Sequence, residues 1–146
     1  MVSADYIVGL TDGEGCFYVL IRPPYNKFGG AKVVLNFFIK VQSIDSRMLE
    51  RVKDSLGCGV LYFQKENRFN HSECIRYTVS SHKDIFGVII PFFQAHPLLG
   101  TAKVRNFQLF CEIADLVKQG RHHAKDGIAQ IQLLKSKMNH GARVVR

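Results

Sequence analysis

The stretch Tyr6-Ile7-Val8-Gly9-Leu10-Thr11-Asp12-Gly13-Glu14-Gly15 decides how the rest of the chain is interpreted. It predicts a short helix that leads into a strand, with Ser3 as its N-cap residue and Asp5 in its first turn. Gly9 and Gly13 are four residues apart and therefore share one helix face, on which another backbone can approach closely. A glycine inside a helix costs about 1 kcal/mol relative to alanine, so an ordinary surface helix gains nothing from this pair.

Two carboxylates, Asp12 and Glu14, follow at the C-terminal end of the same helix. The helix dipole is already negative there, so this end is unfavourable for acidic side chains. Acids placed at a close contact between helices suggest a cation between them. The simpler alternative is a glycine-rich helix end that runs into a turn.

Residues Ile7 to Gly15 resemble the signature motif of the LAGLIDADG homing endonucleases. Glu14 occupies the final acidic position, at which this family uses Asp or Glu. The positions that match by type are Gly9, Leu10, Asp12 and the closing Gly15, and those that depart from the family letters are Val8, Thr11 and Gly13.

The resemblance extends along the chain from about Tyr6 to Gly141. Segments similar to the family pattern are Asp84-Ile85-Phe86, Ile90-Pro91-Phe92-Phe93, Pro97-Leu98-Leu99, Lys103 with Asn106-Phe107, and His123, Gly127, Leu134-Lys135 and Met138-Asn139. The segment Gly100-Thr101-Ala102 places Lys103 one residue further from Leu99 than the family pattern does. This departure bears on whether Lys103 is the family's lysine.

Composition sets the class of protein. A chain of 146 residues with 47% hydrophobic content predicts one globular domain, 1–146. The net charge of +8 and pI near 9.5 favour an anionic polymer as partner, although an ordinary basic protein has the same balance. No apolar run reaches the roughly 18 residues of a membrane span and no signal peptide opens the chain, so no membrane partner is expected. Four cysteines without a CxxC pair predict reduced thiols, no zinc site and an intracellular location, in the cytoplasm or an organellar matrix.

Period-2 alternation predicts strands over 16–22 and 32–42, joined as a long hairpin, and a second hairpin from 60–65 and 74–80. Between the hairpins, Asp45 is expected to cap a helix that Gly57 ends. Ser81 is expected to cap a helix that ends at Pro91, and Thr101 to cap the next one; Ile128, Ile131, Leu134 and Met138 mark a last helix.

The predicted fold class is therefore α+β, with the order αββαββα and an extra C-terminal helix. The repeated αββ unit predicts one four-stranded antiparallel, saddle-like sheet with helices on one face and the other face open.

The resemblance implies cleavage of DNA phosphodiesters with a divalent metal, which supplies a positioned water and neutralises transition-state charge. Mg²⁺, with Mn²⁺ as substitute, prefers hard oxygen ligands, and no small-molecule cofactor is expected. The carboxylate of Glu14 and the backbone carbonyl of Gly13 are the expected ligands; Asp12 is expected to serve the helix end or a subunit interface. Lys103 is the candidate basic catalytic residue and Gln42 the candidate water-organising residue.

One motif supplies one metal-binding acid, whereas cleavage of two strands needs two. The sequence holds a single copy, which predicts a homodimer whose two-fold axis brings both Glu14 residues together. The expected interface residues are Tyr6, Gly9, Leu10, Asp12 and Gly13.

The open sheet face is expected to bind double-stranded DNA. A strand of 9 to 11 residues spans roughly 30–35 Å, about one turn of DNA, and a dimer would cover a pseudo-palindrome of about 20 base pairs. The expected base contacts are Tyr18, Leu20, Arg22, Lys32, Asn36, Phe38, Lys40, Lys65, Arg76 and Thr78, with Lys27 and Arg68 on phosphates.

The leading hypothesis is a sequence-specific, metal-dependent DNA endonuclease of the kind encoded within mobile introns. A non-cleaving RNA maturase or DNA-binding regulator with the same fold remains an alternative. A hydrolase that uses Asp12 and Glu14 as a carboxylate pair on a small substrate is a second alternative, which the basic charge and the shallow sheet disfavour.

Overall fold

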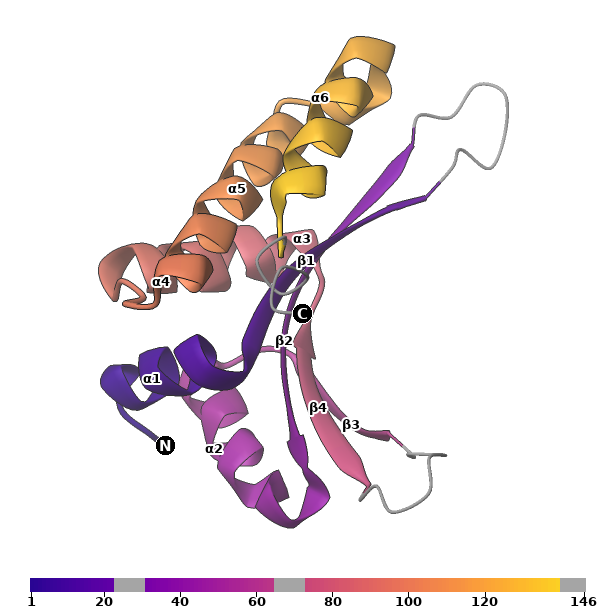
Figure 1. Cartoon of the computed structure of the whole chain (residues 1–146). Helices are drawn as coiled ribbons and strands as arrows, with labels where there is room; N and C mark the ends of the chain where they lie inside the picture. Colours follow the sequence, from indigo (N-terminus) through magenta and orange to yellow (C-terminus); the bar gives the residue numbers. More distant parts are fainter. Residues whose placement is uncertain (23–30, 65–72, 140–146) are drawn as a thin grey trace, which may run out of the picture. The chain divides into compact units, whose positions relative to one another are not determined.

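The computed structural model describes residues 1–22, 31–64 and 73–139, and its elements follow the expected order (Figure 1). The helices and strands are α1 (Ala4–Glu14), β1 (Gly15–Arg22), β2 (Lys32–Gln42), η1 (Ser43–Asp45), α2 (Ser46–Leu56), β3 (Val60–Gln64), β4 (Cys74–Val79), α3 (His82–Asp84), η2 (Ile85–Ile89), α4 (Ile90–Ala95), α5 (Thr101–Lys118), η3 (Arg121–His123) and α6 (Lys125–Lys137).

The strands form one four-stranded antiparallel sheet in the order β1-β2-β4-β3, which confirms the predicted α+β class. In the β2–β4 register, Phe37 lies opposite Val79 and Ile39 opposite Tyr77, and all four side chains are buried. The alternation predicted from the sequence is therefore the one observed. The two helices predicted from Thr101 and around Ile128 are observed as α5 and α6, after the αββαββα core.

The contacts of the chain define two compact units, which are described separately. The first unit comprises Met1–Cys16 and Asn36–Leu98, and the second comprises Phe17–Leu35 and Leu99–Arg146.

The core of the first unit packs helices against one face of β2 and β4. The ring of Phe37 lies 5.4 Å from that of Phe93 in α4, and Leu49 of α2 is fully buried. The hydroxyl of Tyr77 donates a hydrogen bond to the carbonyl of Cys58 (2.8 Å), and burial raises the pKa of Tyr77. Gly59 has φ +97° and a Cβ there would lie 2.5 Å from the Tyr77 ring, so this position requires glycine.

The core of the second unit forms around Phe17 of β1, whose ring lies 5.1 Å from Phe107 and 5.3 Å from Phe110 of α5. Two reciprocal hydrogen bonds join Asn106 of α5 to Asn139, just after α6: the Asn106 amide donates to Asn139 Oδ1 (2.9 Å) and the Asn139 backbone N–H donates to Asn106 Oδ1 (2.8 Å). These bonds fix the end of α6 against α5.

Pro91 does not end its helix, contrary to the prediction, because α4 continues to Ala95. Proline lacks an N–H and its ring clashes with the carbonyl four residues earlier in a regular α-helix. The preceding π-helical turn η2 removes this conflict: the Ile90 N–H donates to the Ile85 carbonyl, five residues back, so the backbone is already widened where Pro91 enters.

Of two further predicted caps, one is wrong and the other is confirmed in position only. Gly100, and not Thr101, is the N-cap residue of α5, because Thr101 already has helical geometry as the first residue. Asp45 stands at the N-cap position of α2 but its side chain makes no capping hydrogen bond, since it belongs to the 3-10 turn η1 and has φ −96°. The caps by Ser3 and Ser81 are confirmed.

Candidate functional site

Helix α1 presents a face without side chains. Ile7, Val8 and Thr11 are buried, whereas Gly9 and Gly13 are exposed, and a Cβ built at either glycine meets no atom within 4 Å. Tyr6, 43% exposed, extends the same surface. The glycine face therefore packs against none of the residues that the structure describes.

Glu14 is the last residue of α1 and is exposed. Gly15 follows with extended backbone and donates its N–H to the Thr11 carbonyl, which closes the helix. A Cβ on Gly15 would lie 2.7 Å from Thr11 Cγ2 and 2.9 Å from Thr11 Cα, so the change from helix to strand needs a glycine there. This tight turn fixes where the Glu14 carboxylate emerges.

The donor set at this helix end fits a hard divalent cation. The last carbonyls of a helix lack partners within it, and the dipole is negative there, so the Gly13 carbonyl and the Glu14 carboxylate offer oxygen ligands in a negative field. In the described ranges, no group of three or more His, Cys, Asp or Glu side chains is placed to hold a metal ion. A single chain thus supplies a partial ligand set, which suits Mg²⁺ because it retains several waters.

The other catalytic candidates belong to other elements of the chain. Gln42 is exposed at the end of β2, opposite Cys74, and belongs to the first unit, as Glu14 does. No hydrogen bond joins Gln42 to Glu14 in the described part of the chain. Lys103 is half-buried in the first turn of α5, in the second unit.

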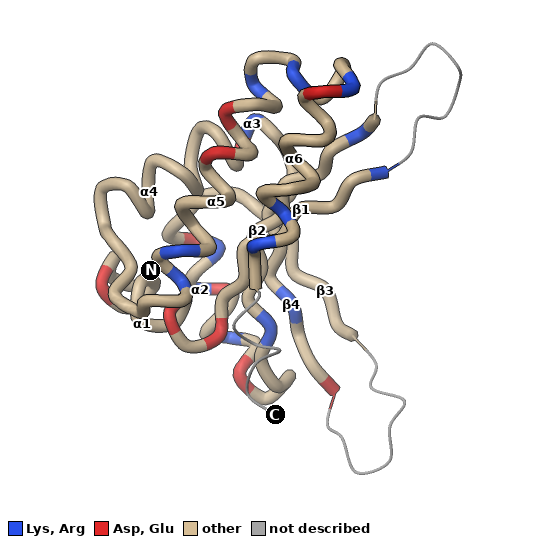
Figure 2. The backbone as a smooth tube through the Cα atoms, turned by 45° about the horizontal axis from the view of Figure 1, so that its top comes forward, with Lys and Arg blue, Asp and Glu red and all other residues tan. Residues whose placement is uncertain are grey.

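The predicted DNA-binding residues that the structure describes lie on the face of the strands opposite the core. In the first unit, six side chains lie on this face, because they alternate with buried residues along their strands or lie opposite one another in the strand register. We call this set the open face: Phe38, Lys40, Val60, Tyr62, Arg76 and Thr78. Figure 2 marks the Lys and Arg positions along these strands in blue. In the second unit, Tyr18 and Arg22 of β1 and Lys32 of β2 are exposed, and Leu20 is half-buried.

Asn36, at the start of the first unit's part of β2, is half-buried. Lys27, Lys65 and Arg68 lie outside the described residues. The DNA contacts as a set stay predictions.

Sequence reasoning missed Tyr62, which is 41% exposed and directly opposite Arg76. Its hydroxyl accepts a hydrogen bond from Arg76 Nη1 (3.4 Å), and this bond is the main cause that lowers the pKa of Tyr62. The sequence could have indicated this position. Tyr62 is two residues from Val60, so both side chains point to the same side of β3, and pairing β3 with β4 places that side on the face of Arg76.

A groove of about 660 Å³ lies in the second unit, between β1 and the end of α6. It is lined by Tyr18, Val19, Ile21, Gln132, Lys135, Ser136, Met138 and Asn139. The Lys135 ammonium lies 5.5 Å from the centre of the Tyr18 ring. None of the candidate catalytic residues lines this groove.

A family model described as LAGLIDADG endonuclease matches residues 7–114. The chain belongs to this family. The resemblance seen in the motif is thereby confirmed. Its nine positions run through α1 from Ile7 to Glu14, along the helix that carries the glycine face, and end at Gly15, the first residue of β1.

Curated relatives of the chain are longer. The chain is 29% identical over 129 residues to a "Probable intron-encoded endonuclease 3" of Neurospora crassa, covering 88% of this chain and 23% of that protein. It is 31% identical over 103 residues to a "Probable intron-encoded DNA endonuclease 1" of Mycosarcoma maydis, covering 70% of this chain and 34% of that one. The chain thus spans about a quarter to a third of their length.

Solved structures of homing endonucleases share the fold. The homing endonuclease I-TnaI superposes with a TM-score of 0.81 at 31% identity, covering 96% of this chain and 90% of that one. I-LtrWI, solved bound to its target DNA, superposes with a TM-score of 0.85 at 34% identity, covering 95% of this chain and 45% of that one. In the described part of this chain, no helix is long and apolar enough to cross a membrane.

Proposed function

We propose that this LAGLIDADG chain is a sequence-specific double-strand DNA endonuclease that uses a divalent metal ion. The observation that supports the proposal most is the exposed Glu14 carboxylate, held by the Gly15 turn at the end of a helix whose glycine face is unpacked. Family membership and the names of the relatives, which are intron-encoded and homing endonucleases, point to the same activity.

Each candidate residue has a distinct role in this proposal. Glu14 and the Gly13 carbonyl hold the metal ion, which when bound activates water and neutralises charge on the phosphate. Lys103, half-buried in the first turn of α5, donates hydrogen bonds to the phosphate oxygens as charge develops. Gln42, exposed at its strand end, orients the attacking water.

Two chains complete the site. The donor set of one chain is partial, and a second copy packed on the Gly9–Gly13 face would supply the second acid at a two-fold axis. The glycine face of α1 suits such a contact, since helices without side chains between them approach closely. I-TnaI, nearly equal in length to this chain, shows that the family includes chains of this size.

DNA binds along the open strand face in this proposal. The net charge of +8 supplies attraction to phosphates, and Lys40 and Arg76 place two cations side by side on β2 and β4. A two-stranded ribbon fits the major groove, where base edges are distinguishable.

Cleavage of a plasmid library with a randomised site tests the proposal. With Mg²⁺, the full chain should linearise those plasmids that carry one family of pseudo-palindromic sites of about 20 base pairs, so that these sites are enriched among the cleaved plasmids. EDTA should abolish the enrichment. Enrichment in a binding selection without any cleavage in Mg²⁺ or Mn²⁺ would instead identify a DNA-binding regulator. No enrichment in either selection contradicts DNA recognition altogether.

A further inference from the structure

A row of three side chains crosses the open face of the first unit. In the strand register, Arg76 of β4 lies directly between Lys40 of β2 and Tyr62 of β3. Phe38 is two residues from Lys40 on the same side of β2, diagonal to Arg76. Because β4 is an inner strand of the sheet, Arg76 stands in the middle of this surface and not at its rim.

Arg76 is held in one orientation by two aromatic neighbours. Its Cζ lies 3.9 Å from the centre of the Phe38 ring, and its Nη1 donates to the Tyr62 hydroxyl at 3.4 Å. Stacking on the ring fixes the plane of the guanidinium, and the hydrogen bond limits its rotation within that plane. Among the described residues, no carboxylate forms an ion pair with Arg76, so its charge is not neutralised by the protein.

The arrangement also decides which donors of Arg76 an acceptor can reach. Nε is buried and has no hydrogen-bond partner within the described chain, so the Nε side of the guanidinium is closed. A guanidinium has five N–H groups, and the remaining ones lie at the Nη1 and Nη2 end. A ligand with two adjacent acceptors would therefore be bound end-on, by Nη1 and Nη2 together.

We infer that Arg76 recognises one guanine in each half of the target site, and that Phe38 and Tyr62 are positioning residues which hold it ready for that base. Guanine presents the adjacent acceptors O6 and N7 in the major groove, and a bidentate arginine contact is the commonest way in which proteins recognise it. An arginine that is already stacked and tethered loses less side-chain freedom on binding. The inference rests on the proposed function, since it names a base within the DNA that the chain would cleave.

A phosphate contact is the competing role for an arginine. Phosphates flank the groove, whereas Arg76 lies on an inner strand, where a ribbon inserted into the groove faces base edges. The two roles differ in what a substitution does: loss of a base contact changes preference at one position, while loss of a phosphate contact weakens binding to all sequences.

Site selection with matched variants of the full chain tests the inference. Wild type, Arg76→Ala, Arg76→Lys, Phe38→Leu and Tyr62→Phe are each selected for binding on the randomised library in Ca²⁺. The preference of wild type for guanine at one position per half-site should fall about 5- to 150-fold in Arg76→Ala and Arg76→Lys, the range of a bidentate base contact. Phe38→Leu and Tyr62→Phe should weaken the preference at that same position, by smaller factors, and leave the other positions unchanged.

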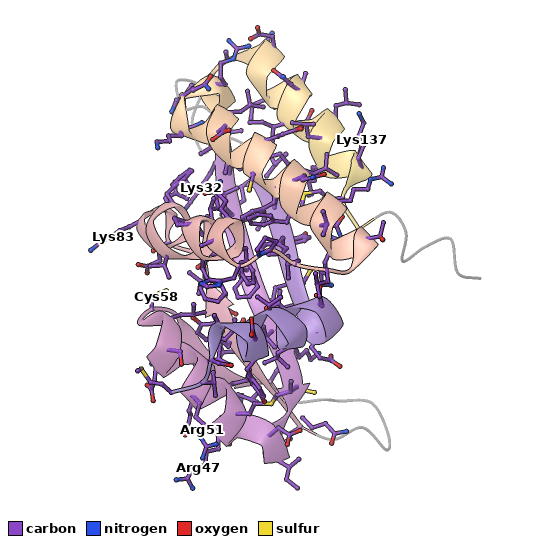
Figure 3. All side chains as sticks on the ribbon, turned by 90° about the vertical axis from the view of Figure 1, so that its left-hand side faces the viewer. Lys32, Arg47, Arg51, Cys58, Lys83 and Lys137 are labelled. Carbon is purple, nitrogen blue, oxygen red and sulfur yellow. The ribbon has the colours of Figure 1, made fainter. Side chains whose placement is uncertain are left out.

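A modified base gives an independent readout. Replacing that guanine by 7-deazaguanine removes the N7 acceptor, and should weaken binding by wild type but not by Arg76→Ala. Arg47→Ala is the charge-matched control, since Arg47 is exposed on α2 and points away from the helix (Figure 3); it should keep the preference at every position. Tyr62→Phe removes a single hydroxyl from a 41% exposed side chain, so it remains informative even if Arg76→Ala folds poorly.

Two results overturn the inference. One is an Arg76→Ala variant that binds every sequence more weakly by the same factor, with a salt slope reduced by about one. The other is an unchanged preference in both Arg76 variants. A wild-type chain that enriches no site refutes the proposed function itself. This outcome differs from failure of the Arg76 inference, because wild type then shows no base preference at any position.

Discussion

Replacing Gly9 by leucine should have opposite effects on the monomer and on its self-association. A Cβ at residue 9 meets nothing within 4 Å, so leucine adds no clash within the chain. Leucine is a far better helix former than glycine, and the free energy of unfolding of the monomer should rise by about 0.5–1 kcal/mol.

The same substitution should disrupt a two-fold contact made through the glycine face. Overpacking a close contact costs about 1–3 kcal/mol per added side chain, and the symmetry introduces two. The dissociation constant of the dimer should therefore rise by roughly 30- to 20,000-fold, from about 2–6 kcal/mol in total.

Size-exclusion chromatography with light scattering, paired with urea unfolding at low concentration, measures both effects. Gly87→Leu is the matched control, because Gly87 is also exposed and also has open space around its Cβ, but lies in η2; it should leave the dimer intact. A Gly9→Leu variant that keeps the dimer mass, or a monomer that becomes less stable, would refute the reasoning.

Three further predictions concern the turn after α1, the charge of the protein and a buried thiol. Gly15→Ala should lower the free energy of unfolding by about 1–3 kcal/mol, because its Cβ would meet Thr11, and should reduce cleavage more than DNA affinity; urea unfolding and a binding assay check both. DNA affinity should fall by about 10³-fold or more between 50 and 200 mM salt if at least six phosphates are contacted, and a flat fluorescence-anisotropy titration would contradict the binding surface. Burial, with a smaller contribution from Asp115, raises the pKa of Cys111 to about 12, so this thiol should resist alkylation at pH 8 until the protein is unfolded, as mass spectrometry of the labelled peptides would show.

The sheet could be predicted from the sequence because each hairpin buries one face. Val33, Leu35, Phe37 and Ile39 are buried in β2, and polar Lys32, Asn36 and Lys40 are among the residues between and beside them. This pattern favours one orientation of the strand. The end of α2 at Gly57 and the start of α3 at Ser81 were equally predictable, because each depends on local geometry. Gly57 has a left-handed φ of +75°, and the Ser81 hydroxyl accepts a hydrogen bond from the Asp84 N–H.

The continuation of helix α4 past Pro91 and the exposure of strand β3 were harder to predict. Proline normally ends a helix, and only a bond pattern that spans five residues allows Pro91 to lie inside one; no single residue type signals such a turn. Strand β3 has five residues, and Val60, Tyr62 and Phe63 are all exposed although apolar or aromatic. Hydrophobic pattern alone assigns such residues to a core, so the role of Tyr62 beside Arg76 becomes visible only from the strand register.

The position of Glu14 in the fold was predictable from the sequence, and that of Lys103 less so. The motif fixes Glu14 at a helix end because glycine spacing and the helix-to-strand turn are both local features. Lys103 depends on where α5 begins, and that helix starts at Thr101 with Gly100 as its N-cap residue, a boundary that the sequence placed one residue later.

Single-turnover cleavage of the recovered target site by Glu14→Gln, at saturating protein in Mg²⁺, tests the central claim most directly. Glutamine keeps the size of the exposed side chain and removes its charge, so the variant should bind the site with an affinity within a few-fold of wild type. Its cleavage rate should fall by at least about 10³-fold, as expected when a charged group that acts on the transition state is lost. A variant that cleaves at the wild-type rate would show that the acid at the end of α1 is not the catalytic one.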